Sequence, residues 1–319
     1  MRMKSKSNKK GMELFINLFP FISLLVVFIG FALLSGGRTL DINNSRKIFE
    51  QSFSLLIVAG AAVFLLSLNC LDMSVGAAVG MAGAVAALVS KQSIPLAFLA
   101  ALLIGLLIGL INGVLHGVLG INAMIATLAM SFILRGILLI VCKSGTLGIA
   151  VKMYDLDHIG LKVAVCLILL VVAWLFFQFH SYGKKCRAVG AGETAAVQSG
   201  IPIALIKVIS YLLMGAAAGI AGFFTVIRTG AAMYNTGNMV EFDILIALIL
   251  GGMPINGGAD SKFRSAVIGV LILGILNNGM VLLGLDTYPQ LITKGIIFIL
   301  VLALTFTIRN KINSSKKVA

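Results

Sequence analysis

The segment Ser181–Lys207, SYGKKCRAVGAGETAAVQSGIPIALIK, is a polar stretch between two apolar runs that are each long enough to cross a lipid bilayer. Its four basic residues outnumber its single acidic residue, Glu193. An excess of lysine and arginine keeps a loop of a membrane protein on the cytoplasmic side. The sequence therefore predicts that this segment faces the cytoplasm and offers a surface to a cytoplasmic partner.

The composition is that of an integral membrane protein. Of the 319 residues, 60% are hydrophobic and only 11% are charged, whereas about a quarter of the residues in a soluble domain are charged. The net charge of +14 comes from basic residues gathered at both ends and in Ser181–Lys207. These residues lack the aromatic-interleaved pattern of a nucleic-acid surface. We expect the charge to set topology and to contact anionic membrane lipid, with no nucleic acid as a partner.

Ten apolar runs are candidates for membrane-spanning helices, each of which needs about 20 residues. In chain order they are Leu14–Leu34, Phe53–Asn69, Ser74–Ser90, Pro95–Gly120, Ala123–Cys142, Leu161–Phe179, Val208–Arg228, Phe242–Met253, Ser265–Leu285 and Tyr288–Ile308. The second and third runs form one tract broken near residues 71–73, and the eighth is short. We expect an all-α polytopic membrane protein with about ten transmembrane helices.

The basic residues give a consistent orientation for these ten runs. If residues 1–13 are cytoplasmic, then residues 181–207, the pair Lys262 and Arg264, and the basic tail 309–319 all fall inside after six, eight and ten crossings. The sequence thus predicts cytoplasmic termini flanking a single transmembrane domain over residues 14–308. The first run is too long for a signal peptide, and no small-residue cleavage site follows it, so we expect it to remain as the first helix.

A faint internal repeat accompanies this order. Asn112-Gly113 is followed by Arg135-Gly136, and Asn278-Gly279 is followed by Lys294-Gly295 on helices that run in the opposite directions. Five helices duplicated in inverted topology are a common plan for transporters. Chance recurrence in a glycine-rich chain is the alternative explanation.

Several polar residues within or between the apolar runs are candidates for a translocation path or its gate. They are Asn69, Asp72, Asn112, Arg135, Asn277, Asn278 and Lys294. Asp72 either lies in a turn at the positive end of the next helix or supports a re-entrant gate. Arg135, near the middle of its run, would cost on the order of 3 kcal/mol if it faced lipid. It either pairs with a carbonyl or an Asn to fix packing, or lines the path.

Four of the other five candidates also have packing interpretations. Asn112, Asn277 and Asn278 can hydrogen-bond across helices, and Lys294 can extend its amine to the interface. His116 stands alone on an apolar run and is expected to be a packing residue. The four cysteines have no CxxC or Cys/His spacing, which argues against a disulfide framework or a zinc site.

Motifs for catalysis and nucleotide binding are missing from the sequence. There is no GxxxxGK[ST], HExxH or GxSxG, and we find no intramembrane pair of carboxylates suited to acid/base chemistry. We therefore expect a transport subunit that is not an enzyme and carries no cofactor or metal of its own. If ATP powers it, another subunit binds the nucleotide.

A short helix is expected at Glu193–Ser199. Gly192 precedes it, Gly200 can adopt the left-handed cap, and Pro202 prevents continuation. A short capped helix on a cytoplasmic face is suited to insertion into a cleft of another protein. The alternative is an ordinary amphipathic connector.

The stretch GKKCRAVGAGETAAVQSGIP, with its AAxxxG core of Ala195, Ala196 and Gly200, resembles the coupling segment of bacterial ABC-importer permeases of the ribose and monosaccharide type. Further stretches are similar to motifs of that family in the same order: LDMSVG (71–76), GLINGVL (109–115), INAMIATLAMSFILRG (121–136), EFDILIALILGG (241–252), LGILNNGMVLLG (273–284) and KG (294–295). Two departures are the charged KFR in MPINGGADSKFRSAVIG after Gly252, and Met124 where the family usually has phenylalanine.

The resemblance implies a ten-helix subunit that pairs with a second copy or a paralogue in the bacterial cytoplasmic membrane. It also implies a cytoplasmic ATPase dimer, which binds ATP and Mg, and an extracytoplasmic sugar-binding protein. The residues expected to couple to the ATPase are Gly192, Glu193, Thr194, Ala195, Ala196, Ser199 and Gly200. The basic residues expected to meet acidic patches of the binding protein are Arg38, Arg46, Lys47, Lys152 and Arg228.

Other functions remain open from the sequence. Nucleoside, autoinducer and branched-chain amino-acid permeases share the architecture that the resemblance implies. A secondary transporter would need no ATPase and would rely on an intramembrane carboxylate, for which Asp72 is the candidate. A structural scaffold would lose only stability on Arg135→Ala.

Overall fold

The computed structural model describes residues 2–143 and 145–317, with side chains described for residues 18–143, 145–303 and 306–307. The basic side chains of residues 1–13 and 309–319 therefore lie outside the described set. The helices that cover the predicted apolar runs are α1 (Arg2–Leu34), α2 (Ile42–Ser67), α3 (Val75–Ser90), α4 (Ile94–Gly113), α5 (Ala123–Cys142), α6 (Ile159–Gln178), α9 (Ile203–Thr229), α10 (Val240–Leu250), α11 (Arg264–Leu282) and α12 (Thr287–Lys317). The other elements are η1 (Arg38–Leu40), the π-helical η2 (Val114–Val118), β1 (Thr146–Gly148), η3 (Val151–Leu156), α7 (Ser181–Ala191), α8 (Glu193–Gln198) and β2 (Ala231–Met233).

Every predicted apolar run contains a helix, and the all-α membrane class is confirmed. Within the part of the chain that the structure describes, six helices are long and apolar enough to cross a membrane: α2, α4 with η2, α5, α6, α9 and α11. Shorter apolar segments lie in α1, α3 and α12. Since length and composition alone do not set the number of crossings, the count of ten and the inverted repeat stay predictions.

Three helices begin well before their apolar runs, and α1 does so at Arg2 and not at Leu14. α2 begins at Ile42 and not near Phe53, because its first turns are amphipathic and bury Asn44 and Ile48. The Asp41 carboxylate accepts a hydrogen bond from the backbone N–H of Asn43, 3.1 Å away, which caps this start. α9 likewise begins at Ile203. Counting only apolar residues misses such polar first turns.

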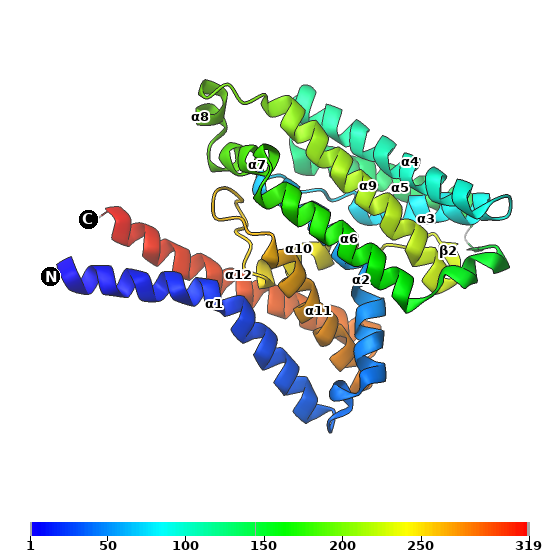
Figure 1. The fold of residues 1–319 in the computed structure, drawn as a ribbon, viewed down its shortest axis with the longest axis horizontal. Coiled ribbons are helices and arrows are strands. Elements are labelled where there is room, and N and C mark those ends of the chain that lie inside the picture. Colours follow the sequence, from blue (N-terminus) through cyan, green and yellow to red (C-terminus); the bar gives the residue numbers. More distant parts are fainter. Residues whose placement is uncertain (1, 144, 318–319) are drawn as a thin grey trace. The chain divides into compact units, whose positions relative to one another are not determined.

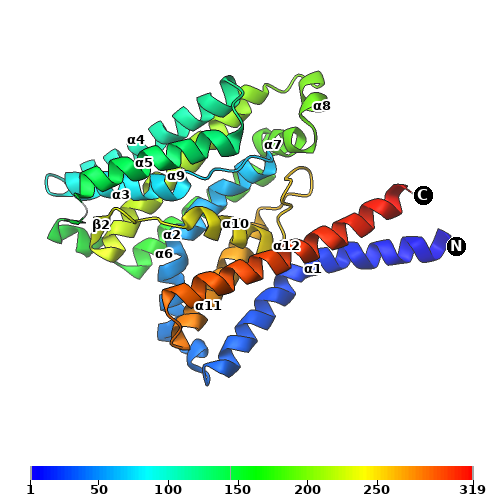
Figure 2. The same cartoon turned by 180° about the vertical axis from the view of Figure 1, so that it is seen from behind.

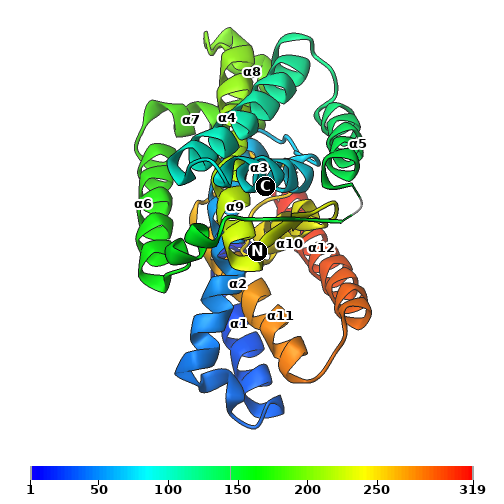
Figure 3. The ribbon, with the colours of Figure 1, turned by 90° about the vertical axis from the view of Figure 1, so that its right-hand side faces the viewer.

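The chain forms two compact units. Unit 1 comprises residues 1–49, 245–253 and 264–319, and unit 2 comprises residues 50–244 and 254–263. In unit 2, α3, α4 and α9 pack against one another, and α5 packs on α3. Figure 3 shows α5 and α6 on opposite sides of this group. Both flanking helices are largely uncovered along their length, as expected for surfaces that face lipid or another subunit.

Glycines allow α4 and α9 to approach until their backbones touch. Gly105, Gly109, Gly113 and Gly117 recur every fourth residue along α4 and η2 and therefore share one face. A Cβ added at Gly105 would overlap the carbonyl oxygen of Gly215 on α9, and one at Gly109 would overlap that of Tyr211. Such small-residue faces drive helix association in membranes through close van der Waals contact.

Unit 2 has two distinct ends. At one end β1 and β2 pair antiparallel, with Thr146 opposite Met233, and the Ile149 backbone N–H donates to the Gly230 carbonyl. At the other end lie α7 and α8, as Figure 1 shows. The strands are three residues long and join loops that are distant in sequence, so apolar periodicity did not predict them.

In unit 1, α1 packs against α11 and α12, and α1 begins and α12 ends on the same side (Figures 1 and 2). The buried Asn44 amide donates to Asn278 Oδ1 across 2.8 Å, joining the first turns of α2 to α11. Gly279 lies against the ring of Phe31, where a Cβ would clash. Asn278 therefore has the helix-packing role that was one of its two predicted interpretations.

We predict that Gly105→Ala destabilises the protein, although alanine is favoured over glycine in a helix by about 1 kcal/mol. The added methyl group would meet the backbone of Gly215 and Gly219, which cannot move without separating α4 from α9. The measurement is the thermal unfolding midpoint in detergent. The matched control is Gly136→Ala in the middle of α5, where a Cβ meets no atom within 4 Å. An unchanged or raised midpoint for Gly105→Ala would contradict the close packing.

Candidate functional site

The polar segment Ser181–Lys207 contains two short helices, of which the sequence predicted one. The missed helix, α7, is amphipathic and buries Tyr182, Cys186 and Val189 while exposing Lys184 and Lys185. The Tyr182 hydroxyl lies 2.9 Å from the Ile206 carbonyl oxygen and donates to it, and it lies 2.6 Å from the Ser210 hydroxyl. α7 is thereby attached to the first turns of α9.

The predicted helix is present as α8, which ends one residue earlier than expected. Gly200 has a φ of +74°, its N–H donates to the Val197 carbonyl, and the Ile201 N–H donates to the Ala196 carbonyl. These two bonds form the Schellman arrangement that glycine permits at a helix end. Ala196 is buried, whereas Val197 is 60% exposed. α8 therefore presents small and apolar groups to the solvent.

The loop of residues 254–263, which departs from the family pattern, lies beside α7. The Gly258 N–H donates to the Ser67 carbonyl at the end of α2 across 2.9 Å. Gly190 of α7 lies against the same carbonyl, so closely that a Cβ would clash. Lys262 is exposed. This loop and α7 thus belong to the same end of unit 2.

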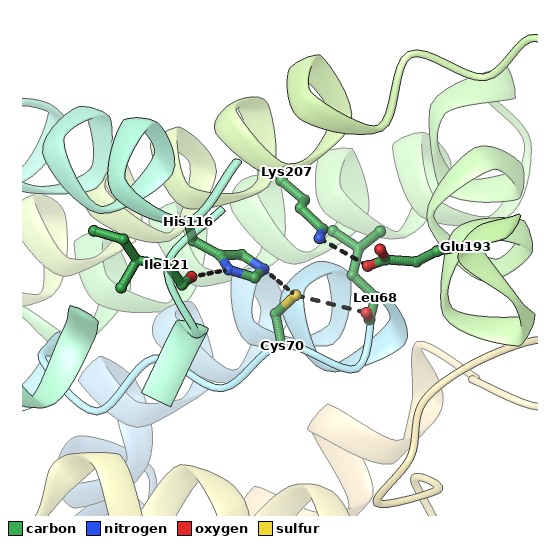
Figure 4. Close-up of polar contacts among 6 residues, drawn as sticks. All are labelled: Leu68, Cys70, His116, Ile121, Glu193 and Lys207. Atoms are coloured by element: carbon green, nitrogen blue, oxygen red, sulfur yellow. Dashed lines mark hydrogen bonds and ion pairs between the residues drawn. The ribbon is translucent and has the colours of Figure 1, made fainter. Parts of the chain in front are cut away.

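An ion pair connects α8 to α9 (Figure 4). Lys207 Nζ lies 2.7 Å from Glu193 Oε1.

The His116 ring in η2 lies near this pair in the same view. Its Nε2 is 3.2 Å from Cys70 Sγ, and its Nδ1 is 2.7 Å from the Ile121 carbonyl oxygen. Both ring nitrogens thus have partners, as expected of a packing residue. Cys70 belongs to the connector between α2 and α3.

That connector, residues 68–74, carries the polar centre of unit 2. Asp72 Oδ1 accepts hydrogen bonds from the Ser74 N–H (2.8 Å) and the Ser74 hydroxyl (2.6 Å). The Asn112 amide of α4 donates to Ser74 Oγ across 2.8 Å. The Met73 N–H donates to the Thr127 hydroxyl of α5 across 3.0 Å. Asp72 therefore has the turn geometry predicted as one alternative, within a network that joins α3, α4 and α5.

A second connector, residues 234–239, also contacts the first turns of α3. Arg135 Nη1 donates to the Thr236 carbonyl (2.8 Å) and Nη2 donates to the Gly237 carbonyl (2.9 Å). Gly237 lies against the backbone of Gly76 in the first turn of α3. Carbonyl pairing was one of the two predicted explanations for Arg135. It satisfies backbone groups that lipid could not.

Glu241 is a polar residue of this centre that the sequence analysis did not single out. It lies in the first turn of α10, and its Oε2 lies against Gly76, where an added Cβ would clash. Oε2 is buried and makes no hydrogen bond in the described residues. The signal was an acidic residue at the start of a short apolar run, in the stretch EFDILIALILGG. An unpartnered buried carboxylate oxygen can accept a hydrogen bond from a hydroxyl-bearing solute.

The remaining predicted path residues are distributed over both units. Asn69 is exposed in unit 2 with a φ of +60°. Asn277 and the half-buried Lys294 lie with Asn278 in unit 1, and the buried Asn277 Oδ1 has no hydrogen-bond partner among the described residues. The structure therefore brings together Asp72, Asn112 and Arg135 within unit 2.

The basic residues predicted to bind an extracytoplasmic partner are all exposed. Arg38, Arg46 and Lys47 belong to unit 1, and Lys152 and Arg228 to unit 2. Lys152 lies on η3, whose Met153 is fully buried and fixes the element to the rest of unit 2. Among the residues with described side chains, no three His, Cys, Asp or Glu residues gather as a metal site.

Comparisons with known proteins find sequence relatives of this chain. Residues 46–304 match the family described as branched-chain amino acid transport system / permease component. The ribose import permease of Escherichia coli K12 is 32% identical over 81% of this chain and 84% of its own length. The ribose import permease of Bacillus subtilis 168 is 31% identical (89% and 91%), and the D-allose transport system permease of Escherichia coli K12 is 31% identical (95% and 97%). No solved structure matches the chain.

We predict that Cys186 is unreactive in the folded protein. Burial raises the pKa of its thiol to about 11, against the opposing effect of hydrogen bonds with Ser210 and Tyr182. Since the thiolate is the nucleophile, roughly one thiol in a thousand is ionised at pH 8. Maleimide labelling followed by mass spectrometry should find Cys186 unmodified in the folded protein, and modified only after a denaturing detergent has unfolded the chain. A Val197→Cys variant, at an exposed position, is the positive control, and rapid native labelling of Cys186 would contradict the burial of α7.

Proposed function

Because the chain belongs to the family of branched-chain amino acid transport system / permease components, we propose that it is the transmembrane permease subunit of an ATP-driven, binding-protein-dependent importer for a monosaccharide. The observation that carries the proposal is α8, a capped helix with an exposed apolar face at one end of unit 2. A subunit with no nucleotide-binding motif needs such a surface to receive energy from a partner.

The substrate class is proposed from the relatives and from the polar centre. The relatives reported above are named for ribose and D-allose, both of which carry several hydroxyl groups. Asn112 Oδ1 and Glu241 Oε2 are buried acceptors without partners in the described residues, and hydroxyl groups are suitable donors. We propose that Asn69, Asp72, Asn112, Arg135 and Glu241 line or gate the path in unit 2. For Asn277, Asn278 and Lys294, which lie in unit 1, a role in the path stays a prediction from the sequence.

The partners follow from the same proposal. A cytoplasmic ATPase dimer, which binds ATP and Mg, would receive α8 together with the exposed lysines of α7. A second permease subunit would complete the path. With ten crossings, the end of unit 2 that carries α7 and α8 faces the cytoplasm, and both termini of the chain face it too.

The end with β1, β2 and η3 is proposed to face the extracytoplasmic sugar-binding protein. Lys152 and Arg228 are exposed there and can meet acidic groups of that protein. For Arg38, Arg46 and Lys47, which lie in unit 1, contact with the binding protein stays a prediction from the sequence. Rim charges of this kind act mainly on association rates, so their effect should weaken as salt increases.

The decisive experiment reconstitutes the chain with the ATPase and binding protein of its own transport system in proteoliposomes. We expect uptake of labelled ribose, allose or a related sugar that requires ATP and all components. Val197→Glu should abolish sugar-stimulated ATP hydrolysis, because a charge on the exposed face of α8 opposes burial in an ATPase cleft.

The matched control for that variant is Val151→Glu, which changes a valine that is 82% exposed on η3. It should leave ATPase association unchanged, as measured by co-purification. Ion-driven uptake by the chain alone would contradict an ATP-driven importer. ATP-driven uptake of a branched-chain amino acid in place of a sugar would contradict the proposed substrate class.

We also predict that Arg135→Ala lowers uptake at a normal amount of folded protein. The variant leaves the Thr236 and Gly237 carbonyls without their donors and removes a positive charge from the polar centre. The measurement is uptake per folded transporter, with the amount determined by size-exclusion chromatography. A loss of uptake that only follows the loss of folded protein would assign Arg135 to packing alone.

A further inference from the structure

We infer that Lys207 is a positioning residue for α8, and that Glu193 is bound within the chain by Lys207 and does not itself contact the ATPase. The inference rests on the proposed function and changes the role of one predicted coupling residue. It also states which side chains of α8 remain for the partner.

The ion pair joins a fixed residue to a less constrained one. The Lys207 side chain is 10% exposed and the Glu193 side chain is 54% exposed, with 2.7 Å between Nζ and Oε1. η2 packs closely against α9 at Lys207. A Cβ added at Gly117 of η2 would lie 3.2 Å from Lys207 Cβ and 3.0 Å from the Ala204 carbonyl oxygen. The backbone of α9 therefore cannot retreat, and Lys207 defines where Glu193 lies.

α8 has few other attachments. It is six residues long, and Ala196 is the side chain that it buries. The Ser199 hydroxyl donates to the Ala195 carbonyl, a bond that is local to this helix end. A six-residue helix is not stable by itself, so its orientation depends on the bonds that join it to neighbouring elements. The Glu193–Lys207 pair is such a bond, and it lies at the first residue of the helix.

The exposed side chains of α8 other than Glu193 are uncharged. With the half-exposed Glu193 carboxylate paired to Lys207, those left for a partner are Thr194, Ala195, Val197 and Gln198. These are small, apolar or neutral groups, which fill a cleft without the desolvation cost of a carboxylate. The geometry thus separates positioning by Glu193 from contact by Val197 and its neighbours.

The same pair gives α8 a physical connection to the polar centre. Lys207 lies against η2, where the His116 ring reaches Cys70 across 3.2 Å, two residues before Asp72 (Figure 4). Displacement of α8 would pull on Lys207 and so press on η2 and the connector of residues 68–74. Contacts between packed elements with discrete arrangements are the means by which separated sites couple.

The test is a double-mutant cycle in the reconstituted transporter with its ATPase and binding protein. The variants are Glu193→Gln, Lys207→Met, the double variant, and Lys207→Arg as the conservative control. The readout is the ratio of sugar-stimulated to basal ATP hydrolysis, together with the ATPase concentration that gives half-maximal association. Folding of each variant is checked by its thermal unfolding midpoint.

We expect Glu193→Gln to lower the stimulation ratio about five- to tenfold, because it leaves a buried ammonium group unpaired. Lys207→Met should lower the ratio less, because the carboxylate that it leaves is half-exposed and hydrated. In the Lys207→Met background, Glu193→Gln should have no further effect, and Lys207→Arg should keep a ratio near that of the wild type.

A further loss on Glu193→Gln in the Lys207→Met background would overturn the inference, since Glu193 would then act on the ATPase directly. An unchanged ratio in both single variants would overturn it too. Failure of the proposed function is distinguishable, because Val197→Glu would then leave ATP hydrolysis unaffected whatever the state of the ion pair.

Discussion

Backbone contact between α4 and α9 is the constraint on which the rest of unit 2 depends. The glycines at every fourth residue of α4 and η2 face Gly215, Tyr211, Val208 and Lys207 in turn, so one line of contact extends from the helix centre to the end that carries α8. In lipid there is little hydrophobic force between helices, and close packing of small residues takes its place. Because Gly117 is part of this line, the position of Lys207, and through it that of Glu193, follows from the same packing.

A second constraint acts where helices are interrupted. Within a bilayer, every backbone polar group must find a partner in the protein, and irregular backbone is tolerated only where protein covers it. In the connector of residues 68–74, the Met73 N–H donates to the Thr127 hydroxyl and the Ser74 N–H donates to the Asp72 carboxylate. The connector of residues 234–239 meets the condition through Arg135. Residues that bond the backbone of these connectors also place polar groups between the apolar helices. For this reason Asp72 and Arg135 are proposed to line a path.

Much of the candidate site was readable from the sequence, and the remainder was not for physical reasons. The capped helix α8 was predicted because Gly200 and Pro202 restrict the backbone locally. α7 was missed because its buried face, Tyr182, Cys186 and Val189, is interleaved with lysines and resembles a solvated loop. Glu241 was missed because an acidic residue before an apolar run is ordinary at the start of a helix. Only the tertiary structure, in which Glu241 packs against Gly76, shows that its Oε2 is buried without a hydrogen-bond partner among the described residues.

The sequence by itself determined the membrane class, the apolar helical runs, the glycine cap of α8 and the family, because these depend on composition, local backbone preference and ordered motifs. The tertiary structure decided which groups meet: Lys207 with Glu193, Arg135 with the carbonyls of Thr236 and Gly237, and β1 with β2. Such contacts join residues that are 14 to 102 positions apart in the chain. Neither local propensity nor periodicity carries information on them, since they arise only when packing of the helices brings their ends together.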